Sequence, residues 1–207
     1  MNTTKFIVFI LTALFSSALF ADTFKRISHV VDAADLEKLH LDISVGELDI
    51  ETYDGEEIQL EVDIESQRSW FSFRRRDVED IELEIDGSRS HVYLGITEQD
   101  IETHWRIVLP AKLELEVDMG VGDVQIADFT NSLNMELGVG SVQVVVLADD
   151  YDVIHANSGV GDSRISGFEG GVDNERNFIS ADSYYYGGGE KIMEIELGVG
   201  DVEIRRR

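Results

Sequence analysis

Hydrophobic and polar residues alternate with a period of two along most of this chain. In each alternating segment, aliphatic side chains fall on one face and Glu, Asp or Gln on the other. This is typical of strands that cover a core with one face and meet water with the other. The segments are residues 39–43, 58–64, 81–85, 113–119, 133–137, 142–146 and 192–197. Helical periodicity is limited to the short stretch 33–39. The pattern predicts an all-β protein.

A glycine motif interrupts the alternation four times: MGVGDVQI at 119–126, LGVGSVQV at 137–144, SGVGDSRI at 158–165 and LGVGDVEI at 197–204, with a relative, SVGELDI, at 44–50. Around the second copy, apolar positions step by two from Leu133 to Val139 and then by three to Val142. A straight strand would turn its core side chains outward at such a slip. A bend at glycine, which adopts positive φ without steric cost, would return both segments to one interior. We therefore expect Val139 and Val142 to share one core, with corners at Gly46, Gly122, Gly140, Gly161 and Gly200.

The spacing of the copies indicates repeats of about 20 residues. The interval is 18 residues from Gly122 to Gly140, 21 more to Gly161 and 39 more to Gly200, which leaves room for a degenerate repeat at 178–189. Such repeats are typical of a β-solenoid, although hairpin meanders show similar spacing. We interpret residues 22–207 as one domain, with N-terminal strands and an irregular cap at 22–110 and Gly-Val-Gly repeats at 111–207. The last strand is expected at an edge, where the terminal arginines at 205–207 would discourage edge-to-edge association.

The first 21 residues have the order of a secretory signal peptide. One lysine precedes a short apolar core at 6–14, and small residues follow at 16–18 and at Ala21. A membrane-spanning helix needs about 20 apolar residues, and polar residues interrupt this stretch. We expect cleavage near Ala21, with Ala18 as an alternative, and a mature chain without a transmembrane span. The protein would then be exported and be periplasmic, displayed on the cell surface or secreted.

The charge balance is strongly acidic, with 42 Asp and Glu against 17 Lys and Arg and a formal net charge of −25. Nucleic-acid binding requires a basic surface, so the sequence predicts no nucleic-acid partner, and an anionic membrane would repel the domain as a whole. Cysteine is absent. Stability must therefore come from the core without disulfides, and thiolate chemistry is excluded.

The candidate chemical motifs favour turns over catalysis. A phosphate loop needs Lys and Ser or Thr after its glycines and a following helix, which this pattern lacks. The corner residues Asp123, Asp162 and Asp201 could hold a cation between stacked repeats, and hydrogen bonding to turn amides is the simpler explanation. The five histidines lack zinc spacing, and paired acids fall on outward strand positions. We predict no catalytic residue, no metal and no cofactor.

One segment, QRSWFSFRRR at 67–76, combines aromatic and cationic side chains in an otherwise acidic protein. These residue types are enriched in binding hot spots. We predict that the segment either docks a partner, an envelope protein or a glycan, or covers the open end of the solenoid. A second, weaker candidate is the tyrosine run 184–186. The predicted patch consists of Trp70, Phe71, Phe73, Arg74, Arg75 and Arg76.

Residues 105–126, WRIVLPAKLELEVDMGVGDVQI, resemble the toast-rack (putative adhesin) family of bacterial β-repeat domains, in which a strand ending in Leu-Pro or Val-Pro leads to a Gly-Asp-Val corner. The upstream segments VGELDI and YDGEEI are also similar, and the resemblance extends over residues 36–205. The chain departs from the family pattern in two ways. It has valine between the glycines of each motif, and it has a tyrosine-rich degenerate repeat. The resemblance implies a right-handed, solenoid-like β-fold in exported or membrane-associated bacterial proteins, without an established enzymatic activity.

Residues and resemblance together predict a non-catalytic, adhesin-like scaffold or binding module of the bacterial envelope. Two alternatives stay open on the sequence. One is a carbohydrate-active lyase or hydrolase built on a β-helix, and the other is a cation-binding β-repeat protein.

Changing Trp70 and the three arginines at 74–76 to alanine tests the predicted patch. We expect capture of envelope partners to be lost, because the aromatic and cationic anchors are removed. The far-UV circular dichroism should stay unchanged. Retained capture would show that the patch is not the docking segment.

Overall fold

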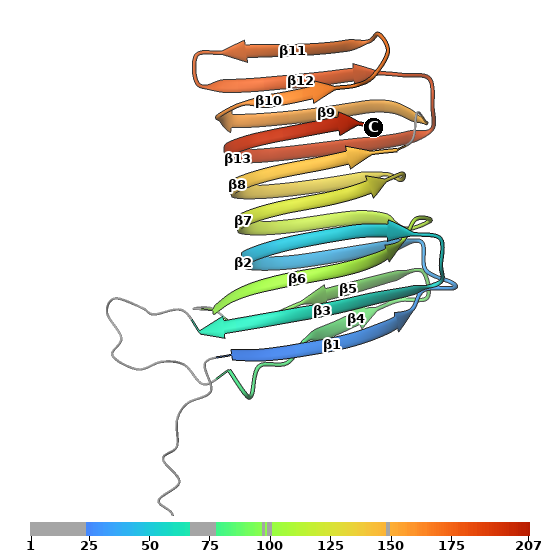
Figure 1. Ribbon diagram of the computed structural model, residues 1–207, viewed down its shortest axis with the longest axis vertical. Coiled ribbons are helices and arrows are strands. Elements are labelled where there is room, and N and C mark those ends of the chain that lie inside the picture. The colour runs from blue at the N-terminus through green and yellow to red at the C-terminus, as the bar shows by residue number, and fades with distance from the viewer. Residues whose placement is uncertain (1–23, 67–77, 97, 99–100, 148–149) are drawn as a thin grey trace, which may run out of the picture.

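The computed structural model describes residues 24–66, 78–96, 98, 101–147 and 150–207. Over these ranges the chain forms strands and turns without a helix, which confirms the all-β prediction, and it therefore has no helix able to cross a membrane. The thirteen strands described belong to one open sheet, folded into a tall stack (Figure 1). They are β1 (Phe24–Asp32), β2 (Lys38–Tyr53), β3 (Glu57–Ser66), β4 (Glu84–Gly87), β5 (His91–Gly95), β6 (Ile101–Pro110), β7 (Glu114–Phe129), β8 (Leu133–Val146), β9 (Tyr151–Val160), β10 (Ser163–Ser166), β11 (Val172–Asn177), β12 (Ser180–Tyr186) and β13 (Lys191–Arg206).

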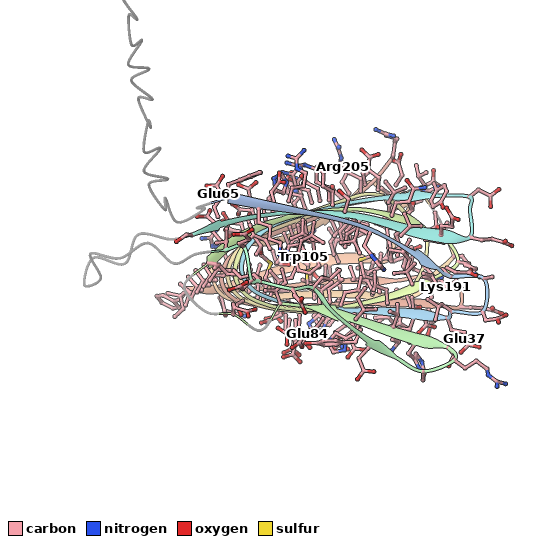
Figure 2. The ribbon with its side chains drawn as sticks, turned by 90° about the horizontal axis from the view of Figure 1, so that it is seen from below. Glu37, Glu65, Glu84, Trp105, Lys191 and Arg205 are labelled. Atoms are coloured by element: carbon pink, nitrogen blue, oxygen red, sulfur yellow. The ribbon has the colours of Figure 1, made fainter. Side chains whose placement is uncertain are left out.

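The stack has two layers because the long strands β2, β7, β8 and β13 bend back on themselves. Their N-terminal halves form a first face with β4, β5, β9, β11 and β12, and their C-terminal halves form a second face with β1, β3, β6 and β10. The long strands pair in parallel and in register across the stack. Viewed along the stack, Trp105 lies between the layers, whereas Arg205 and Glu84 lie on opposite outer sides (Figure 2).

The alternation of the sequence decides which side chains meet between the layers. On β8, Leu133, Met135 and Leu137 are buried, and the intervening Asn134 and Glu136 are exposed. Burying one such aliphatic side chain stabilises a protein by about 1.5–3 kcal/mol. The same pattern recurs on each long strand, so the stack builds one continuous core and needs no disulfide.

Two large aromatic residues of the core have hydrogen-bond partners for their polar atoms. The indole Nε1 of Trp105 donates to Thr103 Oγ1 at 2.9 Å, and this hydroxyl donates to the carbonyl of Val45 at 3.0 Å. The hydroxyl of Tyr151 donates to the carbonyl of Asn131 at 2.9 Å, and burial raises the pKa of Tyr151. Since an unpaired buried polar group costs about 1–3 kcal/mol, these bonds let two large aromatic residues fill the core.

The five corner glycines lie side by side across the stack. Gly46 is in register with Gly122, Gly122 with Gly140, and Gly140 with Gly200, while Gly161 contacts Gly200. Their φ angles lie between +136° and +157°, which L side chains rarely adopt. A Cβ at any of the five would lie 1.6–1.9 Å from a carbonyl oxygen of the neighbouring strand. Both the positive φ angle and the close approach of the neighbouring strand therefore require glycine at these five positions.

The valines between the glycine pairs do not enter the core, so this part of the corner prediction is wrong. Val121, Val139 and Val199 are 45–46% exposed. On β8 the buried positions resume at Val142, five residues after Leu137. At the flanking glycines the backbone is pressed against carbonyl groups of the adjacent strand, so no side chain fits on the inner side of the bend. The valine between them points to solvent.

The stack does not follow the order of the chain. β2 lies between β6 and β7, and β13 lies between β8 and β9. The expectation of a C-terminal edge strand is therefore wrong, since β13 pairs with β8 on one side and with β9 and β10 on the other. The degenerate repeat expected at 178–189 is also wrong. Most of this range is β12, which pairs antiparallel with β9 and with β11 instead of adding a parallel layer to the stack.

The β11–β12 hairpin closes the end of the stack that carries β10 (Figure 1). The side-chain amide of Asn174 accepts from the amide of Ile165 at 2.8 Å and donates to its carbonyl at 3.2 Å, so it satisfies the backbone of β10. The ring of Phe168 packs on Tyr185 with centroids 4.4 Å apart. These contacts cover a strand edge that would otherwise be free to pair with another chain.

Three glycine-to-alanine variants separate the cost of an unfavourable φ angle from the cost of a steric clash with the neighbouring strand. Gly140→Ala introduces both strain and a clash, Gly170→Ala introduces only strain because φ is +71° in open space, and Gly188→Ala introduces neither. We expect losses in the free energy of unfolding of at least about 3, about 1–2 and under about 0.5 kcal/mol, respectively. Urea denaturation measures the series. Equal losses for Gly140→Ala and Gly170→Ala would contradict the importance of the close backbone approach.

Candidate functional site

Four carboxylates lie side by side on the first face, close to the corner. Asp42 is in register with Asp118, Asp118 with Glu136, and Glu136 with Glu196, which places one on each long strand. Neighbouring strands lie about 4.8 Å apart, and like charges directly opposite one another destabilise a sheet. We call these four residues the carboxylate row. Its presence is not explained by the stability of the fold.

A groove of about 730 Å³ runs along the carboxylate row and crosses β2, β7, β8, β13 and β9. Glycines line it where the strands enter the corner, and the strands approach closely there, since a Cβ on Gly138 would lie 2.5 Å from the carbonyl oxygen of Gly120. We call this the acidic groove. Besides the carboxylate row, its lining includes Asn157, Ser44, Gly120, Gly138, Gly159 and Gly198.

The members of the row differ in their partners. Asp118 Oδ2 lies 2.8 Å from Nε2 of His40, and Asp42 accepts a hydrogen bond from the Tyr93 hydroxyl at 3.2 Å. Burial raises the pKa of Tyr93, and the charge of Asp42 raises it further. Within the described ranges, Glu136 and Glu196 have no hydrogen-bond or ion-pair partner. The middle of the groove thus presents two uncompensated negative charges.

One end of the row includes side chains of the type that bind metals. Donor atoms of His40, Glu116 and Asp118 lie within 4.8 Å of one another. These are ligand types that divalent transition metals accept. Lys38 Nζ lies 3.2 Å from Glu116 Oε2 and already balances this carboxylate. The His40–Asp118 contact and the Lys38–Glu116 ion pair therefore already give these side chains partners on the surface of the sheet.

Histidine beside two carboxylates recurs elsewhere on the outer surface. His104 Nε2 lies 2.8 Å from Asp49 and its Nδ1 lies 3.8 Å from Glu47, both on β2. His155 lies 3.7 Å from Asp182 and 3.8 Å from Glu194. The sequence predicts both histidines on the outer face of the sheet, and in the structure both are half-buried between neighbouring side chains of that face. Cross-strand pairing, rather than a spacing motif within one strand, brings the acids to them.

A second groove, of about 830 Å³, lies on the second face over β1, β3, β6, β2 and β7. Arginine pairs with acids along part of it. Arg106 Nη1 lies 2.8 Å from Glu61 and 3.1 Å from Asp63. The hydrogen bond from Arg26 holds the pKa of Asp63 below its ordinary value, and Arg106 contributes to the same shift. The acidic groove differs from this one because no Lys or Arg is among its described lining residues.

The predicted docking patch at residues 70–76 lies outside the described residues. Of the corner acids, Asp123 accepts from the Ser141 hydroxyl at 2.5 Å, and Asp201 accepts from the amide of Asp162 at 2.9 Å. Arg176 forms an ion pair with Asp162. The corner carboxylates thus make contacts typical of turns, and the cluster of three ligand-type residues found in the described part of the chain lies at His40 instead.

The tyrosine run divides between core and surface. Tyr185 is buried against Phe168, whereas Tyr184 stacks on His155 with ring centroids 4.4 Å apart and Tyr186 is 61% exposed. Burial raises the pKa of Tyr184, and the charge of Asp182 adds to the shift. The run therefore offers one exposed ring beside a stacked pair.

The acidic groove was not predicted, although the sequence carries a signal for it. An acid stands three residues before the valine at four of the five corners, in Asp42–Val45, Asp118–Val121, Glu136–Val139 and Glu196–Val199. Each acid alone is an ordinary outward residue. Parallel stacking in register is what turns the repeated spacing into a row.

The double variant Glu136→Gln/Glu196→Gln tests whether the row is strained by repulsion. We expect the free energy of unfolding to rise by about 0.2–1 kcal/mol at low salt, and the gain to shrink as salt screens the charges. Glu203→Gln is the control, because its register neighbours are Gln143 and Arg164. If the free energy of unfolding rises equally in the double variant and in Glu203→Gln, the effect comes from the reduced net charge and not from repulsion within the carboxylate row.

The sequence and the fold both match known proteins. Residues 22–166 match the model of the N-terminal domain of toast_rack, DUF2154. A solved structure from Clostridium sporogenes ATCC 15579, described as a "putative cell adhesion protein", is similar with a TM-score of 0.51 and 17% identity, over 89% of this chain and 100% of that chain. A structure from Bacteroides fragilis NCTC 9343, described as a "putative adhesin", has a TM-score of 0.24 and 10% identity, over 87% and 97% of the two chains. None of the curated proteins matches the sequence.

The first of these structures shares the fold of this chain over nearly its whole length. The family model covers most of the sequence, from before β1 to the end of β10, and includes the first three Gly-Val-Gly corners. The chain therefore belongs to the toast-rack family.

Proposed function

We propose that this domain is a non-catalytic, adhesin-like binding module that acts outside the cytoplasm, at the bacterial envelope. The description of the similar Clostridium sporogenes structure as a "putative cell adhesion protein" supports the role, and the signal-peptide pattern at residues 1–21 supports the location. The module takes up a macromolecular partner along the acidic groove.

The carboxylate row is the observation that carries this proposal. Four acids in register repel one another, and two of them, Glu136 and Glu196, have no partner within the described ranges. The groove beside them is open and crosses five strands, which suits an extended partner better than an enclosed small molecule. A bound partner with positive charge would relieve the repulsion.

The repetition of the long strands supports a finer architectural proposal. β7 and β8 are joined by three residues, pair in parallel and align their corners, as successive turns of a right-handed solenoid would. β2 and β13 then enter this solenoid from distant parts of the chain. The outcome is a rigid, regular surface on which a row of charges keeps a fixed spacing.

The enzyme alternative has less support. A glycan-cleaving site would gather aromatic side chains beside two or three carboxylates in one groove. Among the described residues, the lining of the acidic groove includes carboxylates, glycines and aliphatic residues but no aromatic residue. We therefore expect the purified protein not to turn over envelope glycans.

Capture of envelope components by the immobilised protein tests the binding role. We expect Glu136→Gln/Glu196→Gln to reduce the captured amount at least about tenfold, a loss of about 1.4 kcal/mol in binding, because the charges that face the partner are removed. Glu203→Gln, which removes one charge from the second face, should capture as the native protein does. Equal loss in both variants, or glycan turnover by the purified protein, would contradict the proposal.

A further inference from the structure

The valines at the corner form a continuous apolar stripe on the surface. Val45 is in register with Val121, Val121 with Val139, Val139 with Val199, and Val199 with Val160. The last four are each 45–46% exposed. We call these five residues the corner stripe. Neighbouring strands are about 4.8 Å apart, so the stripe runs for about 19 Å without interruption.

The core does not require this stripe. The side chains of Val121, Val139, Val160 and Val199 are exposed, and each of these four valines lies between two glycines that leave it uncovered. Threonine has the same branched shape and similar strand preference, so a polar residue would serve the bend equally well. Scattered exposed aliphatic residues are ordinary, whereas a contiguous apolar patch on a soluble domain marks an interaction surface.

Acids border the corner stripe on both sides. On the first face lies the carboxylate row, three residues before four of the five valines, and Asn157 takes this place before Val160. On the second face, two residues after the valines, Glu47 is in register with Asp123, and Ser141 lies between Asp123 and Asp201. The surface is thus an apolar line between two negative lines.

This charge pattern selects the occupant. A second copy of the chain would bring its own acidic borders against these, and the formal charge of −25 opposes such a contact. Anionic lipid and nucleic acid are repelled for the same reason. A protein segment with apolar side chains in one line and Lys or Arg on both flanks matches both the apolar and the acidic parts.

We propose that the corner stripe and its acidic borders dock a cationic amphipathic segment of a partner protein. The inference rests on the proposed binding role and names the chemistry of the partner. A helix that covers 19 Å has about 13 residues, at about 1.5 Å per residue. The valines supply apolar contact, and the acids steer the segment to the surface and set its direction.

A designed helical peptide of about 14 residues, with leucines along one face and lysines elsewhere, is the probe. Fluorescence anisotropy compares its binding with that of a scrambled peptide of the same composition. The test variant is Val121→Thr/Val139→Thr/Val199→Thr, which keeps charge and side-chain shape. The control is Val30→Thr/Leu147→Thr/Ile192→Thr, at aliphatic residues that are 46–55% exposed elsewhere.

We expect the test variant to bind the amphipathic peptide at least about tenfold more weakly than the native and control proteins, with an unchanged thermal unfolding midpoint. The scrambled peptide should bind more weakly and equally to all three proteins. Equal binding of the amphipathic peptide by native and test proteins would overturn the inference, because charge alone would then explain the contact. If envelope capture still depends on Glu136 and Glu196 in that case, the binding role stands and only the stripe is wrong. If the native protein neither captures envelope components nor binds the amphipathic peptide, the proposed binding role and the corner-stripe inference are both wrong.

Discussion

At each corner the carbonyl oxygen of one strand occupies the place where the Cβ of the next would be. For Gly140 the distance from that point to the Gly122 oxygen is 1.6 Å, and at the other four corners the corresponding distance is 1.7–1.9 Å. Backbone therefore packs on backbone along one edge of the whole stack. Because this contact aligns the bends of successive strands, it also aligns the buried residues before and after each bend. This backbone contact therefore sets the register of the core residues, of the carboxylate row and of the corner stripe.

Stability and surface chemistry are separated in this fold. The interior consists of aliphatic side chains with a few satisfied polar groups, such as the Trp105–Thr103 pair, and it holds the layers together without disulfides. The outer face of the same strands is free to vary. On the second face Arg26 and Arg106 balance the local acids, whereas around Glu136 and Glu196 the described structure offers no counter-charge. Repulsion among in-register acids is tolerated because the core holds the strands in place.

The strand content could be predicted because period-two alternation reports directly on which face is buried. The exposure of Val139 could not, since alternation assumes a straight strand and fails where backbone fills the inner side of a bend. The order of the strands in the stack could not be predicted from the sequence either. The motifs around Gly140 and Gly200 are nearly identical, so they specify a common register but not which copies become neighbours. For the same reason Asp42 and Asp118, which are 76 residues apart, had no visible relation until the strands were paired.

The position of β13 has a consequence for how the chain reaches this structure. The last 16-residue strand lies between β8 and β9, so these two strands have no partner on their facing edges until residues 191–206 arrive. A nascent chain can assemble β2, β7 and β8 early, but half-built intermediates keep two open edges that other chains could join. Pairing of β13 with β8 and β9 is thus the step that removes these two open edges. Premature termination before this segment would leave an aggregation-prone product rather than a shorter working domain.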